Sequence, residues 1–352
     1  MNLTALLKFV VDKNGTDLFI NVGAPPMIKI TGEMKPVGQT PLQANHVNDI
    51  IKTMLTDDQY EEFTEKRELD IGYALENLGR FRLNVYFQKG EPALVARFIV
   101  SQIPTIEELN LPQSLERLAM IKRGLVLVVG ATGTGKSTTL ASMINYRNEN
   151  SSGHILTIED PVEFMHTHKK SLISQREIGI DTHSYKSALS SAMREAPDVI
   201  LIGESRDAET MKSAITFAET GHLCYTTLHA NNARQAIDRV VNLFPQNLHK
   251  QVRSDLAEHL KAIVCQRLPI GQNGQRLPAV EIMMCTPYVQ ELIREGNIDA
   301  ISEAMVKDND DGSQTFDQAL YGLFIEKKIS EEEALKHADS KDNLKLMIRF
   351  GD

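Results

Sequence analysis

The sequence from Gly124 to Thr139 reads GLVLVVGATGTGKSTT. Its first part is an apolar run, too short for a helix, which ends at the pattern G-x-x-x-x-G-K-[ST] and predicts a buried strand. Glycines in this pattern let successive backbone N–H groups point at phosphate oxygens, and the helix expected at residues 137–147 offers its positive N-terminal end. A glycine-rich turn with no ligand is the alternative, but the strand before the motif and the helix after it favour a P-loop that binds a nucleotide.

Two side chains of this P-loop have specific expected roles. The ammonium group of Lys136 is expected to reach the β- and γ-phosphates, and the hydroxyl of Ser137 is expected to bind Mg²⁺. ATP and Mg²⁺ are therefore the expected cofactors. The residues expected to contact them are Gly130, Ala131, Thr132, Gly133, Thr134, Gly135, Lys136, Ser137 and Thr138.

The composition is that of a folded globular protein. The 352 residues are 42% hydrophobic and 24% charged, and they suffice for two or three domains. The formal charge of −9 disfavours a protein that grips nucleic acid with a broad basic surface. No apolar run approaches the roughly 18 to 20 residues of a membrane span, and the N-terminus lacks the pattern of a secretory signal. We therefore expect a cytoplasmic protein without a nucleic-acid partner.

The three cysteines, Cys224, Cys265 and Cys285, stand apart from one another in the sequence. They supply neither a disulfide framework nor a C-x-x-C metal pair. Free thiols in a reducing compartment are expected, and a structural zinc site is not.

Residues 1–100 are expected to form a small α+β domain with an antiparallel sheet. Phe81, Leu83 and Val85 alternate with polar residues, which is the period of a half-buried strand over residues 80–88. A helix is expected near the N-terminus, because apolar residues recur at helical spacing between residues 3 and 11. Further strands are expected at residues 17–22, 27–30, 69–74 and 93–100, and further helices at residues 43–55 and 57–66.

Three arginines lie on the exposed faces of these predicted strands: Arg80 and Arg82 on one strand and Arg97 on its partner. Charges on the open face of a sheet are usually solvated surface, and that is the alternative to a functional role. The sequence offers them no obvious acidic partner nearby.

Residues 101–112, which contain Pro104 and Pro112, are expected to link this domain to a second one at residues 113–286. The second domain alternates short apolar strands with helices, which is typical of a parallel α/β sheet. Strands expected at residues 154–159, 198–203 and 223–228 end at or just before polar side chains. Residues 287–352 are expected to form a helical C-terminal region.

The carboxyl ends of parallel strands share one edge of a sheet, so the polar residues that follow these strands are expected to meet the P-loop there. They are Glu159, Asp160, Glu163, Glu204 and His229. A carboxylate at that edge is suited to supporting Mg²⁺. The alternatives are that Glu159 and Asp160 are helix-capping acids and that His229 is a structural residue at a strand end.

Four ordered motifs resemble those of the secretion ATPase superfamily, over nearly the whole chain. They are GATGTGKST at the P-loop, LTIEDPVEF, APDVILIGESRD and TGHLCYTTLH. The chain is most similar to type IV pilus retraction ATPases of the PilT/PilU kind. This resemblance implies a PAS-like N-terminal domain joined to a RecA-like ATPase domain, with six chains in a ring. It also implies an inner-membrane platform protein at the pilus base as partner, and a paralogous retraction ATPase as a further one.

The resemblance also implies roles for residues outside the P-loop. Glu204 would support Mg²⁺, and Glu163 would polarise the attacking water. His222 and His229 would report on the γ-phosphate. Three arginines fall where the family places those that reach a neighbouring subunit's nucleotide: Arg80, Arg82 and Arg97.

Departures from the family's motifs favour one branch over another. The absence of paired C-x-x-C motifs favours retraction ATPases over assembly ATPases. Gln290 stands where retraction motors carry an arginine, and Ser205 stands in place of an apolar residue after Glu204. Both favour the accessory PilU paralogue.

Three functions therefore stay open. The first is a motor whose Mg²⁺-dependent ATP hydrolysis powers pilus retraction and twitching motility. This motor would associate peripherally with the inner membrane. The second is an accessory nucleotide-binding subunit that docks on the main motor and hydrolyses ATP slowly. The third, a ring that translocates DNA, is disfavoured by the net charge.

Overall fold

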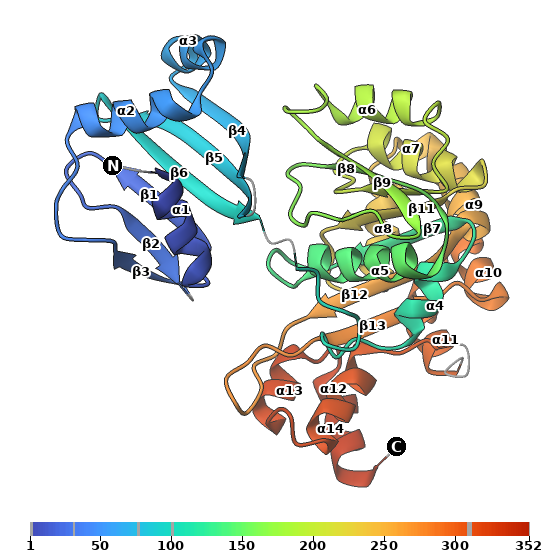
Figure 1. The fold of residues 1–352 in the computed structure, drawn as a ribbon. Coiled ribbons are helices and arrows are strands. Elements are labelled where there is room, and N and C mark those ends of the chain that lie inside the picture. Colours follow the sequence, from blue (N-terminus) through green and yellow to red (C-terminus); the bar gives the residue numbers. More distant parts are fainter. Residues whose placement is uncertain (1–2, 31, 76–77, 100–101, 308–311, 352) are drawn as a thin grey trace. The chain divides into compact units, whose positions relative to one another are not determined.

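The computed structural model describes the chain except residues 1–2, 31, 76–77, 100–101, 308–311 and 352. The chain forms two compact units (Figure 1). The first comprises Met1–Gln102 with Glu163–Met165, and the second comprises Ile103–Val162 with His166–Asp352. The end of the strand predicted at residues 93–100 and the start of the predicted linker at residues 101–112 lie outside the described residues.

The first unit contains a six-stranded antiparallel sheet and three helices. Its elements are α1 (Leu3–Asp12), β1 (Asp17–Asn21), β2 (Met27–Ile30), β3 (Glu33–Pro36), α2 (Ala44–Met54), α3 (Asp57–Lys66), β4 (Glu68–Leu75), β5 (Gly79–Gln88) and β6 (Glu91–Ile99). The strand order is β3-β2-β1-β6-β5-β4. Phe81, Leu83 and Val85 of β5 are fully buried with Leu7 of α1 and Ile51 of α2. This confirms the predicted alternation, because only one face of β5 meets the helices.

The second unit contains a seven-stranded sheet. Its elements are α4 (Ser114–Met120), β7 (Gly124–Val129), α5 (Lys136–Asn150), β8 (Gly153–Glu159), β9 (Ser171–Glu177), α6 (Tyr185–Ala192), β10 (Val199–Ile202), α7 (Ala208–Glu219), β11 (Leu223–Leu228), α8 (Ala233–Asn242), η1 (Gln246–Leu248), α9 (His249–His259), β12 (Leu260–Arg267), β13 (Ala279–Met284), α10 (Pro287–Glu295), η2 (Ile298–Ala300), α11 (Ile301–Lys307), α12 (Phe316–Ile325), α13 (Glu331–His337) and α14 (Lys341–Phe350). The strand order is β13-β12-β7-β11-β10-β8-β9, and all neighbours are parallel except β12 and β13.

Strand β7 lies inside this sheet and is buried along its whole length. A parallel strand covered on both faces reads as a continuous apolar run, which is why this strand and β8, β10 and β11 were predictable from sequence. The bounds of strands β9 and β12 were not predicted. The edge strand β9 carries several polar residues, and β12 follows α9 without a break, so neither has the signature of a buried central strand.

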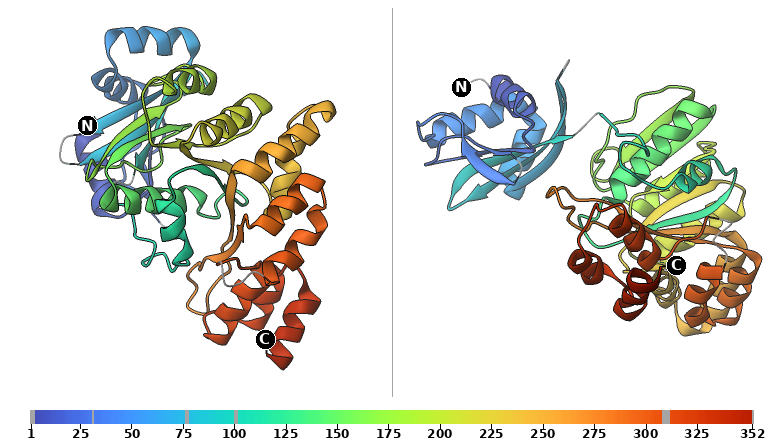
Figure 2. Two further views of the ribbon diagram at one scale, coloured as in Figure 1. Left: turned by 90° about the vertical axis from the view of Figure 1, so that its right-hand side faces the viewer. Right: turned by 90° about the horizontal axis from the view of Figure 1, so that it is seen from below.

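The C-terminal helices pack into the second unit rather than forming a unit of their own. Phe316, Leu320 and Leu344 belong to the same hydrophobic cluster as Leu127 and Val129 of β7. Helices α12 to α14, drawn in red, lie beside one another (Figures 1 and 2). In the part of the chain that the structure describes, no helix combines the length and apolar character that crossing a membrane requires.

Candidate nucleotide site

The loop between β7 and α5 has the backbone of a phosphate cradle. Gly133 and Gly135 adopt φ angles of +77° and +86°, which residues with a Cβ rarely adopt. A Cβ on Gly130 would lie 2.5 Å from Thr134 Oγ1 and 2.8 Å from the carbonyl oxygen of Gln266. The loop therefore needs its glycines, and its geometry fits a bound polyphosphate at the N-terminus of a 15-residue helix.

The side chain of Lys136 folds back over this loop. Its Nζ donates hydrogen bonds of 2.9 Å to the carbonyl oxygens of Gly130 and Ala131. The ammonium group therefore lies against the backbone of the P-loop. Thr139 connects helix α5 to β12, because its hydroxyl donates a 2.7 Å hydrogen bond to the side chain of Gln266.

The carboxyl ends of β10 and β11 bring Glu204 and His229 together. The two strands are parallel neighbours, with Ile202 beside Thr226. His229 Nε2 lies 3.2 Å from one carboxylate oxygen of Glu204, and Arg206 donates a 2.8 Å hydrogen bond to the other. These contacts hold the half-buried carboxylate at the edge of the sheet from which the P-loop emerges.

The neighbouring end of β8 carries Glu159 beside the Gly203–Glu204 turn. A Cβ on Gly203 would lie 3.2 Å from the Glu159 Cα and 3.0 Å from the hydroxyl of Tyr185. Burial, followed by the charges of Asp160 and Glu159, raises the pKa of Tyr185, so the phenol keeps its proton. Tyr185 was not predicted as a site residue. It lies on a helix that carries no recognisable motif, and only the folded chain brings it to these strand ends.

Glu163, the predicted water-polarising residue, is exposed. It belongs to the short segment Glu163–Met165 that is part of the first unit, whereas Glu159 and Glu204 belong to the second. Within the second unit, the strand ends bring Glu159 close to the Gly203–Glu204 turn.

His222 lies at the opposite end of β11 from His229. It precedes Leu223, which pairs with Gly124 at the start of β7, whereas the P-loop follows the end of β7. A six-residue strand spans about 20 Å, so His222 does not reach a phosphate held by the P-loop of its own chain. Its ring packs edge-on against Phe217 and its Nδ1 lies 3.0 Å from the hydroxyl of Thr220. The predicted contact of His222 with the γ-phosphate does not fit this placement within one chain.

Two of the three predicted arginines of the first unit, Arg82 and Arg97, have acidic partners, contrary to the sequence-based expectation. Arg82 Nε donates hydrogen bonds of 2.9 and 3.0 Å to the two carboxylate oxygens of Asp70, and Arg97 Nε donates one of 2.8 Å to Asp17. These partners lie on neighbouring strands, 12 and 80 residues away in sequence, so only the strand register reveals them. Among the described residues, Arg80 forms no ion pair.

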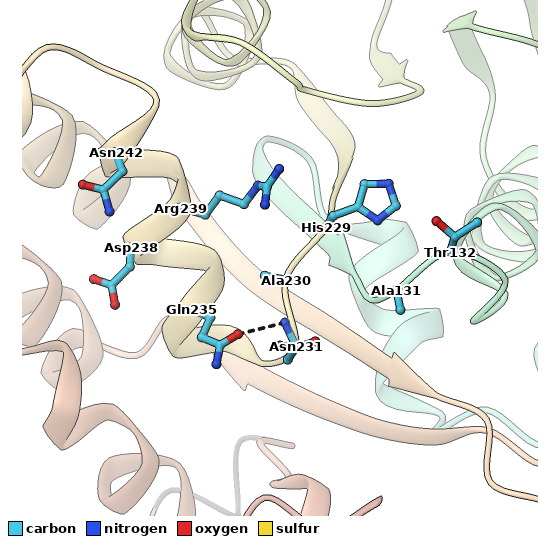
Figure 3. Close-up of a pocket in the computed structure, with 9 residues that line it drawn as sticks. All are labelled: Ala131, Thr132, His229, Ala230, Asn231, Gln235, Asp238, Arg239 and Asn242. Carbon is cyan, nitrogen blue, oxygen red and sulfur yellow. Dashed lines mark hydrogen bonds between the residues drawn. The ribbon is translucent and has the colours of Figure 1, made fainter.

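A pocket of about 580 Å³ lies between the P-loop and helix α8. Ala131 and Thr132 line one side, and Gln235 and Arg239 of α8 line another. In Figure 3 the side chain of His229 points toward Thr132 of the P-loop, and the side chain of Arg239 extends from α8 toward His229. The pocket is therefore a continuation of the predicted phosphate site toward the end of β11.

Two polar departures from the family's motifs are accommodated locally. The buried hydroxyl of Ser205 lies 2.9 Å from that of Thr226, so the polar side chain next to Glu204 is satisfied. Gln290, on helix α10, donates a 3.3 Å hydrogen bond to the carbonyl oxygen of Cys285.

The chain is similar in sequence and structure to known proteins. Residues 100–275 match the family model described as type II/IV secretion system protein. The chain is 47% identical to the type IV pilus ATPase PilU of Pseudomonas aeruginosa, over 100% of this chain and 92% of that protein. It is 42% identical to the type IV pilus retractation ATPase PilT of the same organism, over 97% of this chain and 100% of that protein.

A solved structure shares the fold along the whole chain. The pilus retraction motor PilT with bound ADP superimposes with a TM-score of 0.92 at 37% identity, covering 99% of this chain and 100% of that one. The predicted fold class and the resemblance to the PilT/PilU kind are thereby confirmed.

Proposed function

The chain belongs to the type II/IV secretion system protein family and is a P-loop ATPase, and we propose that it powers type IV pilus retraction as a hexameric ring. The observation that carries this proposal is the meeting of the P-loop, Glu204 and His229 at one edge of the sheet. Similarity to PilU and PilT over nearly their full lengths supports the coupling of that site to a pilus.

In the proposed cycle, the amides of the P-loop bind the phosphates, and Lys136 exchanges its two carbonyl acceptors for phosphate oxygens. Ser137 and Glu204 would hold Mg²⁺, which neutralises phosphate charge when bound. His229 shares the Glu204 carboxylate with Arg206, so a change at the γ-phosphate alters the same network of contacts. A carboxylate, from Glu163 or Glu159, orients the attacking water.

The ring is proposed because phosphoryl transfer is slow without an arginine beside the transferred group. The second unit presents Arg206 and Arg239 near the site, but Arg206 is engaged with Glu204, and Arg239 lies on α8, on another side of the pocket from Ala131 and Thr132. We assign the missing charge to Arg80 of a neighbouring subunit, with Arg82 and Arg97 in supporting positions. Force would then pass to a platform protein of the inner membrane, at the cytoplasmic side of the pilus base.

The proposal is tested by deleting the gene, counting surface pili and scoring twitching motility. A retraction motor predicts hyperpiliated cells that do not move. Bald cells would contradict retraction and indicate pilus assembly instead.

A second candidate is an accessory subunit that docks on a paralogous motor. The 47% identity to PilU and the glutamine at position 290 favour it. Unchanged pili and motility after deletion, together with slow turnover of the purified protein, would support this candidate over the first.

A further inference from the structure

Arg267, the last residue of β12, joins three segments of the second unit that are far apart in sequence. Its guanidinium donates a 2.9 Å hydrogen bond to the carbonyl oxygen of Asn231, in the loop that follows His229. It also donates to the carbonyl oxygen of His337 and pairs with Asp339, both in the C-terminal helical region. Only 18% of the Arg267 side chain is exposed, because the group lies over the ring of Phe316, 3.8 Å from its centroid.

Asp339 connects the same two regions a second time. Its other carboxylate oxygen accepts a 3.0 Å hydrogen bond from the side chain of Asn232. Asn232 is the N-cap of α8, where its own oxygen accepts from the backbone of Gln235. On its other side, the backbone N–H of Asp339 donates 2.9 Å to Asp317 on α12. The ion pair is thus tied to the start of α8 and to the C-terminal helices.

The strand that carries Arg267 also reaches the P-loop. The preceding residue, Gln266, accepts the hydrogen bond from Thr139 on α5, and its carbonyl oxygen packs against Gly130. The first amide of α8 is fixed from the sheet by Glu281, which accepts a 2.7 Å hydrogen bond from Ala233. The loop from His229 to Asn232 is therefore held between the P-loop side of β12 and the C-terminal helices.

We propose that Arg267 and Asp339 are positioning residues, through which the C-terminal helices hold His229 against the nucleotide site. A partly buried ion pair is suited to this task, because losing either partner leaves the other charge with less compensation and releases the loop. Displacement of α13 and α14 would then lower turnover without disturbing the glycines that hold the other phosphates. The proposal rests on the γ-phosphate role of His229 given above.

The experiment compares purified full-length variants Arg267→Gln, Asp339→Asn and the double variant. The readouts are kcat and KM for ATP, the affinity for ADP and the thermal unfolding midpoint. A displaced loop is expected to lower kcat on the order of 10- to 100-fold, since misplacement by about 1 Å has effects of that size. ADP affinity is expected to stay within about twofold, because ADP lacks the γ-phosphate, and the double variant should add little to either single one.

Two further variants serve as controls. Arg267→Lys keeps the charge and should recover part of kcat. Arg234→Gln breaks an exposed ion pair between the same helix, α8, and Asp299, and should behave like the unaltered protein. Unchanged kcat in folded Arg267→Gln and Asp339→Asn would overturn the proposal. So would a parallel fall of kcat, ADP affinity and unfolding midpoint, which would indicate a purely structural role.

His229→Ala, measured beside them, separates the two levels of the proposal. If it loses turnover while Arg267→Gln keeps it, the positioning role alone is wrong. If His229→Ala turns over normally, the role of His229 is wrong, and the positioning proposal fails with it.

Discussion

The P-loop edge of the second unit and the arginine face of the first unit are both rich in charged groups, but they use them differently. At the P-loop edge, Glu204 and His229 are turned toward each other, and the ammonium group of Lys136 donates hydrogen bonds to two carbonyl oxygens of the P-loop. On the arginine face, Arg82 and Arg97 are engaged by acids of neighbouring strands, 12 and 80 residues away in sequence. The two regions therefore differ in the partners of their cations. At the P-loop the partners are backbone carbonyl oxygens, and on the arginine face they are carboxylates. Sequence alone does not show this difference.

Lys136→Ala is expected to have the largest effect, because it removes the ammonium group that lies on the P-loop and that is proposed to bind the phosphates. Turnover should fall to background and ATP affinity should fall with it, as measured by phosphate release and by nucleotide binding. Lys186→Ala, which breaks an exposed ion pair with Glu209 in the same unit, is the control. Retained turnover in Lys136→Ala would mean that the P-loop edge is not the active site.

Arg80→Ala tests the other half of the comparison. If Arg80 completes a neighbour's site, turnover should fall on the order of 10³-fold while nucleotide binding persists.

Arg97→Ala should lower the unfolding midpoint more than turnover, because it leaves the buried carboxylate of Asp17 without its partner.

Mixing subunits shows whether Arg80 acts between chains. An Arg80→Ala chain with an intact P-loop should regain turnover beside a Lys136→Ala chain with an intact arginine. No recovery in assemblies shown by mass to contain both chains would count against a shared site.

Glu163→Gln asks which unit supplies the carboxylate that orients water. Loss of general-base action lowers turnover by about 10²- to 10⁴-fold, while the amide preserves ATP binding. Glu159→Gln is the matched variant within the second unit. Normal turnover in Glu163→Gln with a dead Glu159→Gln would move the role to the end of β8.

Glu281→Gln should have the smallest effect on turnover, and its main effect should be on stability. Burial raises the pKa of Glu281 to about 7, so the folded state holds this proton more tightly than the unfolded chain. Stability should therefore fall as the pH rises from about 4.5 to about 7, by at most about 3 kcal/mol. Denaturant unfolding of Glu281→Gln should lack this component, whereas Glu303→Gln, on the surface, should keep it.

Much of the site was predictable because its residues follow buried parallel strands. Glu204 and His229 each come directly after or near the end of an apolar run, and such ends share one edge of the sheet. The contacts of Tyr185, Gln266 and Arg267 were not predictable, because they depend on how helices and edge strands pack. The ion pairs of the arginine face depend on strand register, which the alternation of β5 does not specify.

The central claim is that each chain has an ATP-hydrolysing site and that Glu204 is required for hydrolysis there. It is tested most directly by measuring ATP binding and phosphate release on the same preparation of Glu204→Gln. The amide keeps the shape of the side chain but loses the negative charge that is proposed to support Mg²⁺. We predict ATP binding close to that of the unaltered protein, with turnover reduced at least about 100-fold. Turnover at the unaltered rate would contradict the claim.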